Sequence, residues 1–253
     1  STVAAVRDGF ASYRFDQAAQ AAYEFTWYEF CDWYLEFSKT VMQSNESTAE
    51  QRRGTRHTLI ETLEALLRLL HPLMPFITEE IWQRVAPRAG IAAQSIMRQP
   101  YPSVAPDAMQ PPIEAEVRWV MDFILGVRRI RGELDIAPSL QLSARLQGAS
   151  RAEQERYARH AGAIRRLAGI ADAVPLAAGE APPQAAAALL GDMRILVPMA
   201  GLIDVDAELA RLGKRRSKVE QELARANGKL GNENFVRNAP AEVIAQERTR
   251  VEE

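Results

Sequence analysis

The sequence predicts a mainly helical protein in three parts: a helical bundle over residues 1–136, a small α+β module over 137–201, and a C-terminal antiparallel coiled-coil hairpin over 202–253. Three patterns along the chain carry this prediction. Apolar residues recur at helical spacing in the first part, alternate with polar residues from Leu140 in the second, and form heptads from Leu202 in the third.

The first part contains four predicted helical segments, over residues 14–42, over 47–70, after Pro75, and over 112–133. A capping box, Ser47-x-x-Glu50, is predicted to begin the second segment. Prolines recur from Pro87 to Pro112, so this stretch cannot be one continuous helix. We expect an irregular connector there that wraps the surface of the bundle.

The stretch HPLMPFITEEIW, residues 71–82, predicts a stiff corner between two helices. Pro72 ends the helix that precedes it, and Pro75 suits the first turn of the next one. Thr78 is a candidate cap for that helix. The apolar residues of the corner are expected to be core: Leu73, Met74, Phe76, Ile77 and Trp82.

The second part begins with a half-buried strand, because apolar and polar residues alternate from Leu140 to Gln147. A capping box, Ser150-x-x-Glu153, then opens a helix that closes near Gly169. Short apolar runs separated by glycine and proline predict further strands over residues 171–176, 185–190 and 193–199. These elements make a small module of three or four strands and one helix.

A heptad pattern dominates the third part, and its a and d positions are Leu202, Val205, Leu209, Leu212, Arg216, Val219, Leu223, Ala226 and Leu230. Such a helix needs a partner. GNENF at 231–235 interrupts it, and Pro240 suits the first turn of a second helix. We therefore expect the chain to fold back on itself, with a returning helix too short to cover the whole of the first.

Composition indicates a globular protein, with 47% hydrophobic and 25% charged residues. The single cysteine, Cys31, excludes an internal disulfide and is typical of a reducing cytosol. The histidines, His57, His71 and His160, do not have metal-ligand spacing, so we expect no metal site. No run of about 18 apolar residues occurs, and the sequence predicts no signal peptide, no membrane partner and a cytoplasmic location.

Charge is distributed unevenly along the chain, although the formal net charge is only −2. Residues 1–50 hold three basic and eight acidic residues, whereas 211–229 hold seven basic residues and only two acidic ones, Glu220 and Glu222. Such a basic stripe on a nearly neutral protein favours a polyanionic partner. The alternative is a solvated face of a coiled coil.

Four stretches together resemble the C-terminal part of the valyl-tRNA synthetase family: YRFDQAAQAAYEFTWYEFCDWYLEFSK at 13–39, LLRLLHPLMPFITEEIW at 66–82, VRRIRGELDI at 127–136 and ENFVRNAPAEVIAQER at 233–248. The resemblance covers essentially the whole chain. It implies an anticodon-binding bundle, a small linker module and a coiled-coil arm that touches the tRNA outside the anticodon. It also implies two partners, valine tRNA and an N-terminal catalytic domain in the full-length protein.

The catalytic motifs of that family are missing from these residues. HIGH and KMSKS, which bind ATP in the family, do not occur, and neither does a G-x-G-x-x-G or P-loop motif. ATP is therefore expected as a cofactor of the full-length enzyme and no cofactor is expected here. We expect a fragment of an ATP-dependent ligase that is inactive by itself.

RNA contacts are expected from arginine and lysine, and the chain has 27 Arg and four Lys. In the bundle the candidates are Arg128, Arg129 and Arg131, which could instead compensate a helix dipole or pair with Glu133 or Asp135. In the arm the candidates are Arg211, Lys214, Arg215, Lys218, Arg225 and Lys229.

Other conspicuous residues are expected to be structural. The aromatic row Phe30, Trp33, Tyr34 and Phe37 has helical spacing, which favours core packing over base stacking. Cys31 and His71 are expected to be buried structural residues. Two alternatives to the tRNA-binding function remain open: a non-catalytic scaffold whose coiled coil binds another protein, and the equivalent region of an isoleucyl, leucyl or methionyl enzyme.

Overall fold

The computed structural model describes residues 1–105, 109–177, 179–200, 205–232, 237 and 239–252. The chain divides into two compact units, Ser1–Val197 and Pro198–Glu253, and each unit is described by itself. The predicted domain boundary between residues 136 and 137 falls inside the first unit. That boundary stays a prediction.

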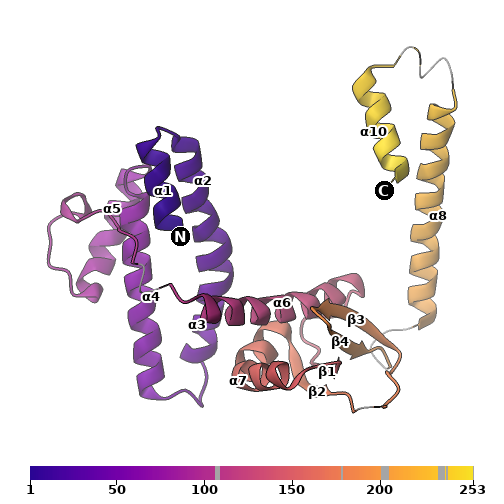
Figure 1. Cartoon of the computed structure of the whole chain (residues 1–253), viewed down its shortest axis with the longest axis horizontal. Coiled ribbons are helices and arrows are strands. Elements are labelled where there is room, and N and C mark those ends of the chain that lie inside the picture. The colour runs from indigo at the N-terminus through magenta and orange to yellow at the C-terminus, as the bar shows by residue number, and fades with distance from the viewer. Residues whose placement is uncertain (106–108, 178, 201–204, 233–236, 238, 253) are drawn as a thin grey trace. The chain divides into compact units, whose positions relative to one another are not determined.

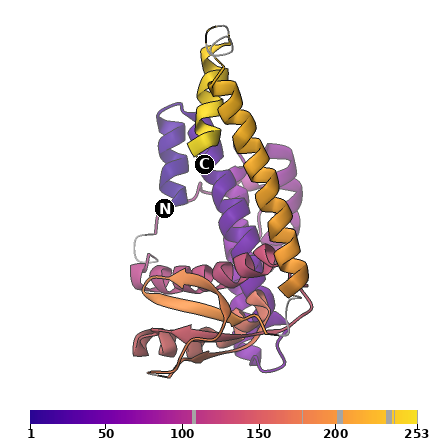
Figure 2. The ribbon, with the colours of Figure 1, turned by 90° about the vertical axis from the view of Figure 1, so that its right-hand side faces the viewer.

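The first unit begins with a bundle of α1 (Thr2–Ala11), α2 (Phe15–Glu24), the π-helical segment η1 (Phe25–Tyr34), α3 (Leu35–Met42), α4 (Ala49–Leu70) and α5 (Pro75–Val85), as Figures 1 and 2 show. Helices α1 and α2 approach closely at Gly9, where a Cβ atom would lie 2.8 Å from the backbone nitrogen of Ala18. A buried cluster of Val6, Ala18, Ala22 and Leu69 surrounds this contact. Glycine is therefore required at position 9.

The helix predicted over residues 14–42 is present, but its middle segment, Phe25–Tyr34, is π-helical. A π-helix has i→i+5 hydrogen bonds, so its side chains do not repeat every 3.6 residues. The aromatic row that was predicted as core is consequently split. Phe30 is 5% exposed, whereas Trp33, Tyr34 and Phe37 are half-buried.

Helix α4 is capped by Thr48, one residue later than the predicted Ser47. Thr48 Oγ1 accepts a hydrogen bond of 3.1 Å from the backbone nitrogen of Gln51. Gln51 Oε1 in turn accepts one of 2.8 Å from the backbone nitrogen of Thr48. Because glutamine serves as well as glutamate at the third helical position, the capping box uses Thr48 and Gln51 instead of Ser47 and Glu50.

The corner between α4 and α5 is present as predicted, and α5 begins at Pro75. Thr78 does not cap α5. Its hydroxyl lies inside the first turn, where it donates a hydrogen bond of 2.8 Å to the carbonyl oxygen of Met74 and lies 2.7 Å from His71 Nδ1. Thr78 and half-buried His71 thus hold the corner closed from its inner side.

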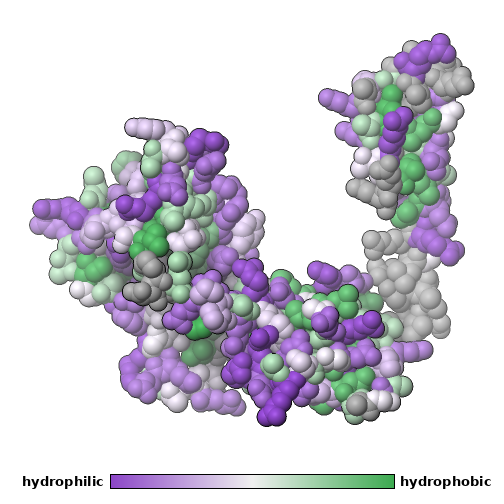
Figure 3. Space-filling view, in the orientation of Figure 1, coloured by the Kyte–Doolittle hydropathy of each residue, from purple (hydrophilic) through white to green (hydrophobic). Residues whose placement is uncertain are grey.

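Most residues of the corner are not core, so that prediction was wrong. Leu73 is half-buried, and the exposed fractions are 45% for Met74, 89% for Phe76 and 53% for Ile77. Helix α5 turns Thr78 and Trp82 inward, one helical turn apart, so the opposite face of its first turn points to solvent. Figure 3 shows hydrophobic side chains on the visible face of this region. Trp82 alone confirms the prediction, because it is 0% exposed.

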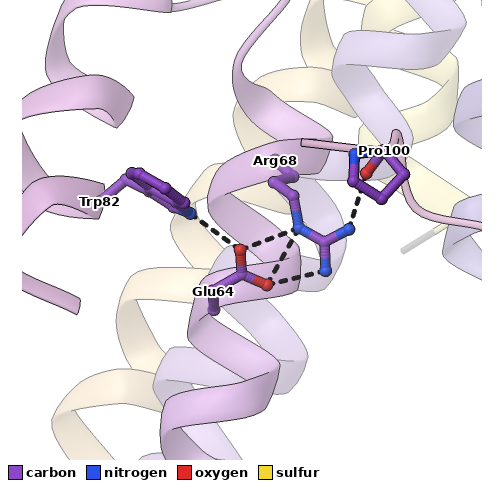
Figure 4. Close-up of polar contacts among 4 residues, drawn as sticks. All are labelled: Glu64, Arg68, Trp82 and Pro100. Carbon is purple, nitrogen blue, oxygen red and sulfur yellow. Dashed lines mark hydrogen bonds and ion pairs between the residues drawn. The ribbon is translucent and has the colours of Figure 1, made fainter. Parts of the chain in front are cut away.

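A buried carboxylate joins α4 to α5 (Figure 4). Glu64 is 3% exposed and accepts a hydrogen bond of 2.8 Å from Trp82 Nε1. Arg68 approaches the same carboxylate, with its Nη2 2.7 Å from Glu64 Oε2, and its Nη1 donates to the carbonyl oxygen of Pro100 at 2.7 Å. A buried carboxylate is tolerated only when it is paired in this way.

The chain between α5 and the next long helix is irregular, as predicted, with two short 3-10 helices, η2 (Ala86–Ala89) and η3 (Ile96–Arg98). It is tied to the bundle by its own backbone and side chains. Tyr101 donates a hydrogen bond of 2.9 Å to the carbonyl oxygen of Leu69, and Arg7 donates one of 3.1 Å to that of Pro102.

The last bundle helix, α6, leads into the module, whose elements are α6 (Pro111–Glu133), β1 (Leu142–Gln147), α7 (Arg151–Ala168), β2 (Ile170–Pro175), β3 (Ala185–Leu190) and β4 (Met193–Pro198). Each predicted strand is present, although β1 begins after Leu140. The capping box of Ser150 and Glu153 is confirmed, and Gly169 ends α7 with φ +68°.

The sheet has the order β2-β1-β4-β3, with β1 parallel to β2 and antiparallel to β4. Alternating residues of β1, Leu142, Ala144 and Leu146, are buried, which confirms the predicted period of two. Helix α6 packs against β3 close to Gly126, where a Cβ atom would lie 3.1 Å from that of Ala188. Helix α6 is thereby shared between bundle and module.

In the second unit, α8 (Val205–Leu230) and α10 (Ala241–Glu252) pack against each other with opposite chain directions (Figures 1 and 2). Figure 3 shows hydrophobic side chains along the line where they face each other. Ala226 is buried there, and Leu230 and Ile244 are half-buried. The helix expected after Pro240 is therefore present, while the coiled-coil character of the pair stays a prediction.

Candidate RNA-binding surfaces

Arg131, predicted to contact RNA, is occupied within the protein. From the last turn of α6 its guanidinium donates to the carbonyl oxygens of Ala168 at 3.0 Å, Ala137 at 3.1 Å and Leu140 at 2.5 Å, and to that of Gly169. Partial burial lowers the pKa of Arg131 from its usual value. Arg131 thereby fixes α6 to the segment before β1 and to the end of α7. Ion pairs with Glu133 or Asp135 are not needed to explain the position of its guanidinium.

Arg128 and Arg129 differ in their surroundings, although they are neighbours. Arg128 Nε donates a hydrogen bond of 3.0 Å to the carbonyl oxygen of Leu167, and its guanidinium carbon lies 5.7 Å from the centre of the Trp33 ring. Arg129 is exposed and has no side-chain hydrogen bond or ion pair with a described residue. Of the three predicted arginines, Arg129 is the one whose donors face solvent.

The candidates on the arm lie along α8. Lys214, Lys218, Arg225 and Lys229 are exposed. Arg211 and Arg215 belong to α8, but their side chains lie outside the described residues. The described lysines and arginine therefore project from the helix, as residues that contact a phosphate backbone must.

The predicted seam of α8 is only partly covered. Arg216 forms an ion pair of 3.4 Å with Glu220 and its side chain is 80% exposed, while Val219 and Leu223 are 55% and 40% exposed. Seam positions from Leu202 to Leu212 lie outside the described side chains. Within this chain, α10 has 12 residues and α8 has 26.

Besides Phe76, five aromatic side chains among the described residues of the bundle are exposed, and none of the five was a predicted site residue. Their exposed fractions are 81% for Tyr13, 53% for Phe15, 52% for Tyr23, 53% for Trp27 and 54% for Tyr28. The rings of Tyr23 and Trp27 are stacked, with centres 6.3 Å apart and planes 7° apart. The i, i+4 spacing of Tyr23 and Trp27 could have predicted that these two rings lie side by side. The π-helical segment that begins at Phe25, and with it the outward direction of Trp27 and Tyr28, has no sequence signature.

The predicted aromatic row lines a shallow apolar cavity of about 250 Å³ between η1, α4 and α6. Trp33, Tyr34 and Phe37 form one side, and Thr58 and Met121 close the other. Burial raises the pKa of Tyr34. The row therefore serves packing between helices, with Phe30 buried and Trp33, Tyr34 and Phe37 half-buried.

The described residues contain no group of three or more His, Cys, Asp or Glu that could hold a metal ion. Cys31 is a half-buried free thiol. Among the helices that the structure describes, none is both long and apolar enough to cross a membrane.

Two family models match the chain in different regions. Residues 1–146 match the anticodon-binding domain of tRNA ligases, and residues 204–253 match the tRNA binding arm of valyl tRNA synthetase. The first match spans the bundle, and the second spans the helices α8 and α10.

Individual relatives agree with these matches. The valine–tRNA ligase of Xylella fastidiosa (strain M12) is 46% identical over 248 residues, which cover 96% of this chain and 25% of the relative. That of Xanthomonas campestris pv. campestris (strain B100) is 46% identical over 244 residues, covering 96% and 26%. The chain thus spans about a quarter of the length of these relatives. Since the first family model covers more than half of its residues, the chain belongs to the family of anticodon-binding domains of tRNA ligases.

Proposed function

We propose that this chain is the tRNA-binding C-terminal portion of a valine–tRNA ligase. The observation that carries the proposal is the presence of two different tRNA-related regions on one chain, an anticodon-binding domain at 1–146 and a valyl-type arm at 204–253. A single match to the bundle would fit several ligases. The arm at 204–253 favours the valyl enzyme over its isoleucyl, leucyl and methionyl counterparts.

The bundle is proposed to recognise the anticodon. Unpaired loop bases are held by stacking on aromatic or arginine planes and by hydrogen bonds to their edges. Arg129 supplies free donors. Exposed aromatic rings supply such planes at Tyr13, Phe15, Tyr23, Trp27 and Tyr28. Arg131 and Arg128 contribute instead by fixing the end of α6.

The arm is proposed to grip the body of the tRNA through its basic side chains. Exposed Lys214, Lys218 and Arg225 can each reach a phosphate, which contributes affinity without reading sequence. The competing scaffold function would call for a balanced pattern of charges on α8. A stripe of seven basic and two acidic residues over 211–229 supports a polyanion instead.

Aminoacylation would require the part of the ligase that lies outside this chain. The relatives are about four times as long, and ATP-binding motifs of the class do not occur in these residues. We therefore propose that an N-terminal catalytic domain is the protein partner of this chain, that ATP is bound there, and that the ligase works in the cytosol. The chain alone should not support valine-dependent exchange of pyrophosphate into ATP.

The test is binding of the purified chain to transcripts of valine tRNA and isoleucine tRNA, measured by fluorescence anisotropy at several salt concentrations. The proposal predicts tighter binding of valine tRNA, with an affinity that falls as salt rises. Equal affinity for both would favour a sibling ligase or a general RNA binder. Binding of neither transcript would favour the scaffold.

A further inference from the structure

A polar cleft lies in the first unit between α7 and the loop that joins α3 to α4. Its volume is about 920 Å³. One wall is the loop at 44–47, with Asn45 and Ser47, and the other is α7, with Arg159, Arg165 and Arg166. None of these residues belongs to the surfaces described above. The cleft is much larger than the aromatic cavity and has room for a stretch of polymer backbone.

The charge of the cleft is positive. Three arginines line it, against a single carboxylate at Glu46. Arg159 is partly neutralised, because its Nε lies 3.0 Å from Glu116 Oε1, which also lies 2.7 Å from His160 Nε2. The positive charge left over therefore comes from the last two arginines of α7.

Arg165 and Arg166 are exposed, and neither forms an ion pair with a described residue. Arg165 Nε donates only a long hydrogen bond of 3.3 Å to the carbonyl oxygen of Ala161 in its own helix. Arg166 donates to Oε1 of Gln43, the residue that follows α3. Since a guanidinium carries five N–H donors, most donors of both side chains stay available.

The remaining lining matches the same ligand. Asn45, Ser47 and Gln141 offer amide and hydroxyl groups, which together with arginine make most contacts to phosphate and sugar oxygens in nucleic-acid complexes. Arginines in a last helical turn also stabilise the helix end. Stabilising a helix end does not require polar groups on the opposite side of a cleft. Here amide and hydroxyl groups line the same cleft as the arginines.

We propose that this cleft binds a stretch of the sugar-phosphate backbone of tRNA, with Arg165 and Arg166 on phosphate oxygens. The inference rests on the proposed function and adds to it a third contact surface, separate from the bundle aromatics and from the arm. Phosphate contacts fix the position of the nucleic acid without reading its sequence. The cleft thus contributes affinity for the tRNA body and no preference between anticodons.

The first experiment compares two double variants of the whole 253-residue chain. Arg165→Gln with Arg166→Gln removes two charges from the cleft, and Arg145→Gln with Arg151→Gln removes two from exposed positions outside it. At about 0.7 to 0.9 per phosphate contact, the cleft variant should make the slope of log affinity against log salt shallower by about 1.4 to 1.8. At 0.1 M salt this corresponds to a loss of roughly 25- to 60-fold. The control should lose much less.

The Arg165→Gln single variant keeps the contact between Arg166 and Gln43. Its salt slope should change by about half as much as that of the double variant. This comparison separates a loss of RNA contacts from any loosening of α3 against α7. Circular dichroism and thermal melting check that each variant is folded. A cleft variant that is folded and loses no more affinity than the control overturns the inference. So does an equal loss of slope in both double variants.

A second measurement uses the unmodified protein. Phenylglyoxal modifies accessible arginines, and mass spectrometry reports the rate at each position with and without valine tRNA. Arg165 and Arg166 should be protected by the tRNA, while Arg145 and Arg151 should not. If the chain binds tRNA but neither pair is protected, the proposal that the cleft binds the tRNA backbone is contradicted, while the proposed function is not. Absence of any tRNA binding by the wild-type chain is instead a failure of the proposed function.

Discussion

Trp82 Nε1 donates a hydrogen bond of 2.8 Å to Glu64 Oε1, from a fully buried side chain to a carboxylate that is 3% exposed. Arg68 completes the arrangement as the paired cation. A buried carboxylate that loses a partner keeps its desolvation cost, so these residues stabilise the bundle as a unit. The bond explains why position 82 holds tryptophan rather than another large apolar residue.

Replacing Trp82 with Phe should lower the free energy of unfolding by about 2 to 3 kcal/mol. The aromatic ring is largely retained, but the hydrogen bond to a charged acceptor is lost, and such bonds contribute about 1.5 to 3 kcal/mol. Urea unfolding followed by circular dichroism measures the change. A loss below about 0.5 kcal/mol would mean that the Glu64 carboxylate does not depend on the indole.

Trp119 provides the matched control for that variant. Its Nε1 is buried but has no hydrogen-bond partner among the described residues, and its ring lies 5.2 Å from the guanidinium carbon of Arg156. Trp119→Phe should therefore cost less than about 1 kcal/mol, mainly through a weaker cation–π contact. Equal losses at Trp82 and Trp119 would point to ring volume alone.

Phe76→Ala should change the free energy of unfolding by less than about 0.5 kcal/mol, because its side chain is 89% exposed. Trp82→Ala, six residues further along the same helix, should cost about 3 to 5 kcal/mol. Chemical unfolding of the two variants side by side measures the contrast. A large decrease in the free energy of unfolding for Phe76→Ala would mean that the Phe76 side chain is buried in the core.

The contribution of Glu116 to stability should depend on pH. Hydrogen bonds from Arg159 and His160 lower its pKa from 4.5 to about 2. The unfolded chain then binds this proton more readily than the folded one, so the contribution is complete above about pH 4.5 and falls as the pH falls toward 2. The melting temperature of Glu116→Gln should lie below that of wild type at pH 6, and the difference should narrow below about pH 4.5 and close near pH 2.

A Glu114→Gln variant removes an exposed carboxylate from the same helix and serves as the control for net charge. The difference in melting temperature between Glu114→Gln and wild type should not narrow in the same way as the pH falls. A constant gap between wild type and Glu116→Gln from pH 6 to pH 3 would contradict the assignment of the low pKa to this ion pair.

Changing Lys214 and Lys218 to Gln should leave helicity and melting nearly unchanged, because exposed charges contribute little to folding. If each contacts a phosphate, the salt slope of tRNA affinity should become shallower by about 1.4 to 1.8. The Lys→Arg variants keep the charge and should keep the slope. An unchanged salt slope in the Lys→Gln variant would mean that the basic stripe is only a solvated helix face, and would favour the scaffold function.

Local patterns in the sequence predicted most helices and strands and their order along the chain, although α1 was not predicted. The alternation in β1, the box at Ser150 and the break at Pro75 depend on neighbours in the chain, and each is present. The shift from Ser47 to Thr48 arose because two adjacent boxes compete, and only the backbone decides between them.

The orientation of helical faces could not be predicted in the same way. Phe76 and Trp82 look alike in an apolar stretch, but the hydrogen bonds of Glu64 and Thr78 fix which side of α5 faces the core. Likewise, Arg131 resembles its neighbours in VRRIRGELDI, yet carbonyl groups from residues 137–169 surround it. Contacts between distant segments leave no periodic trace.

Transplanting the valine anticodon into isoleucine tRNA tests the central claim most directly. The chain is proposed to recognise the anticodon with its bundle, so the chimeric transcript should bind more tightly than unaltered isoleucine tRNA and approach valine tRNA in affinity at the same salt concentration. The reverse chimera, valine tRNA with the isoleucine anticodon, should bind more weakly. Affinities that follow the tRNA body and ignore the anticodon in both chimeras would contradict the account.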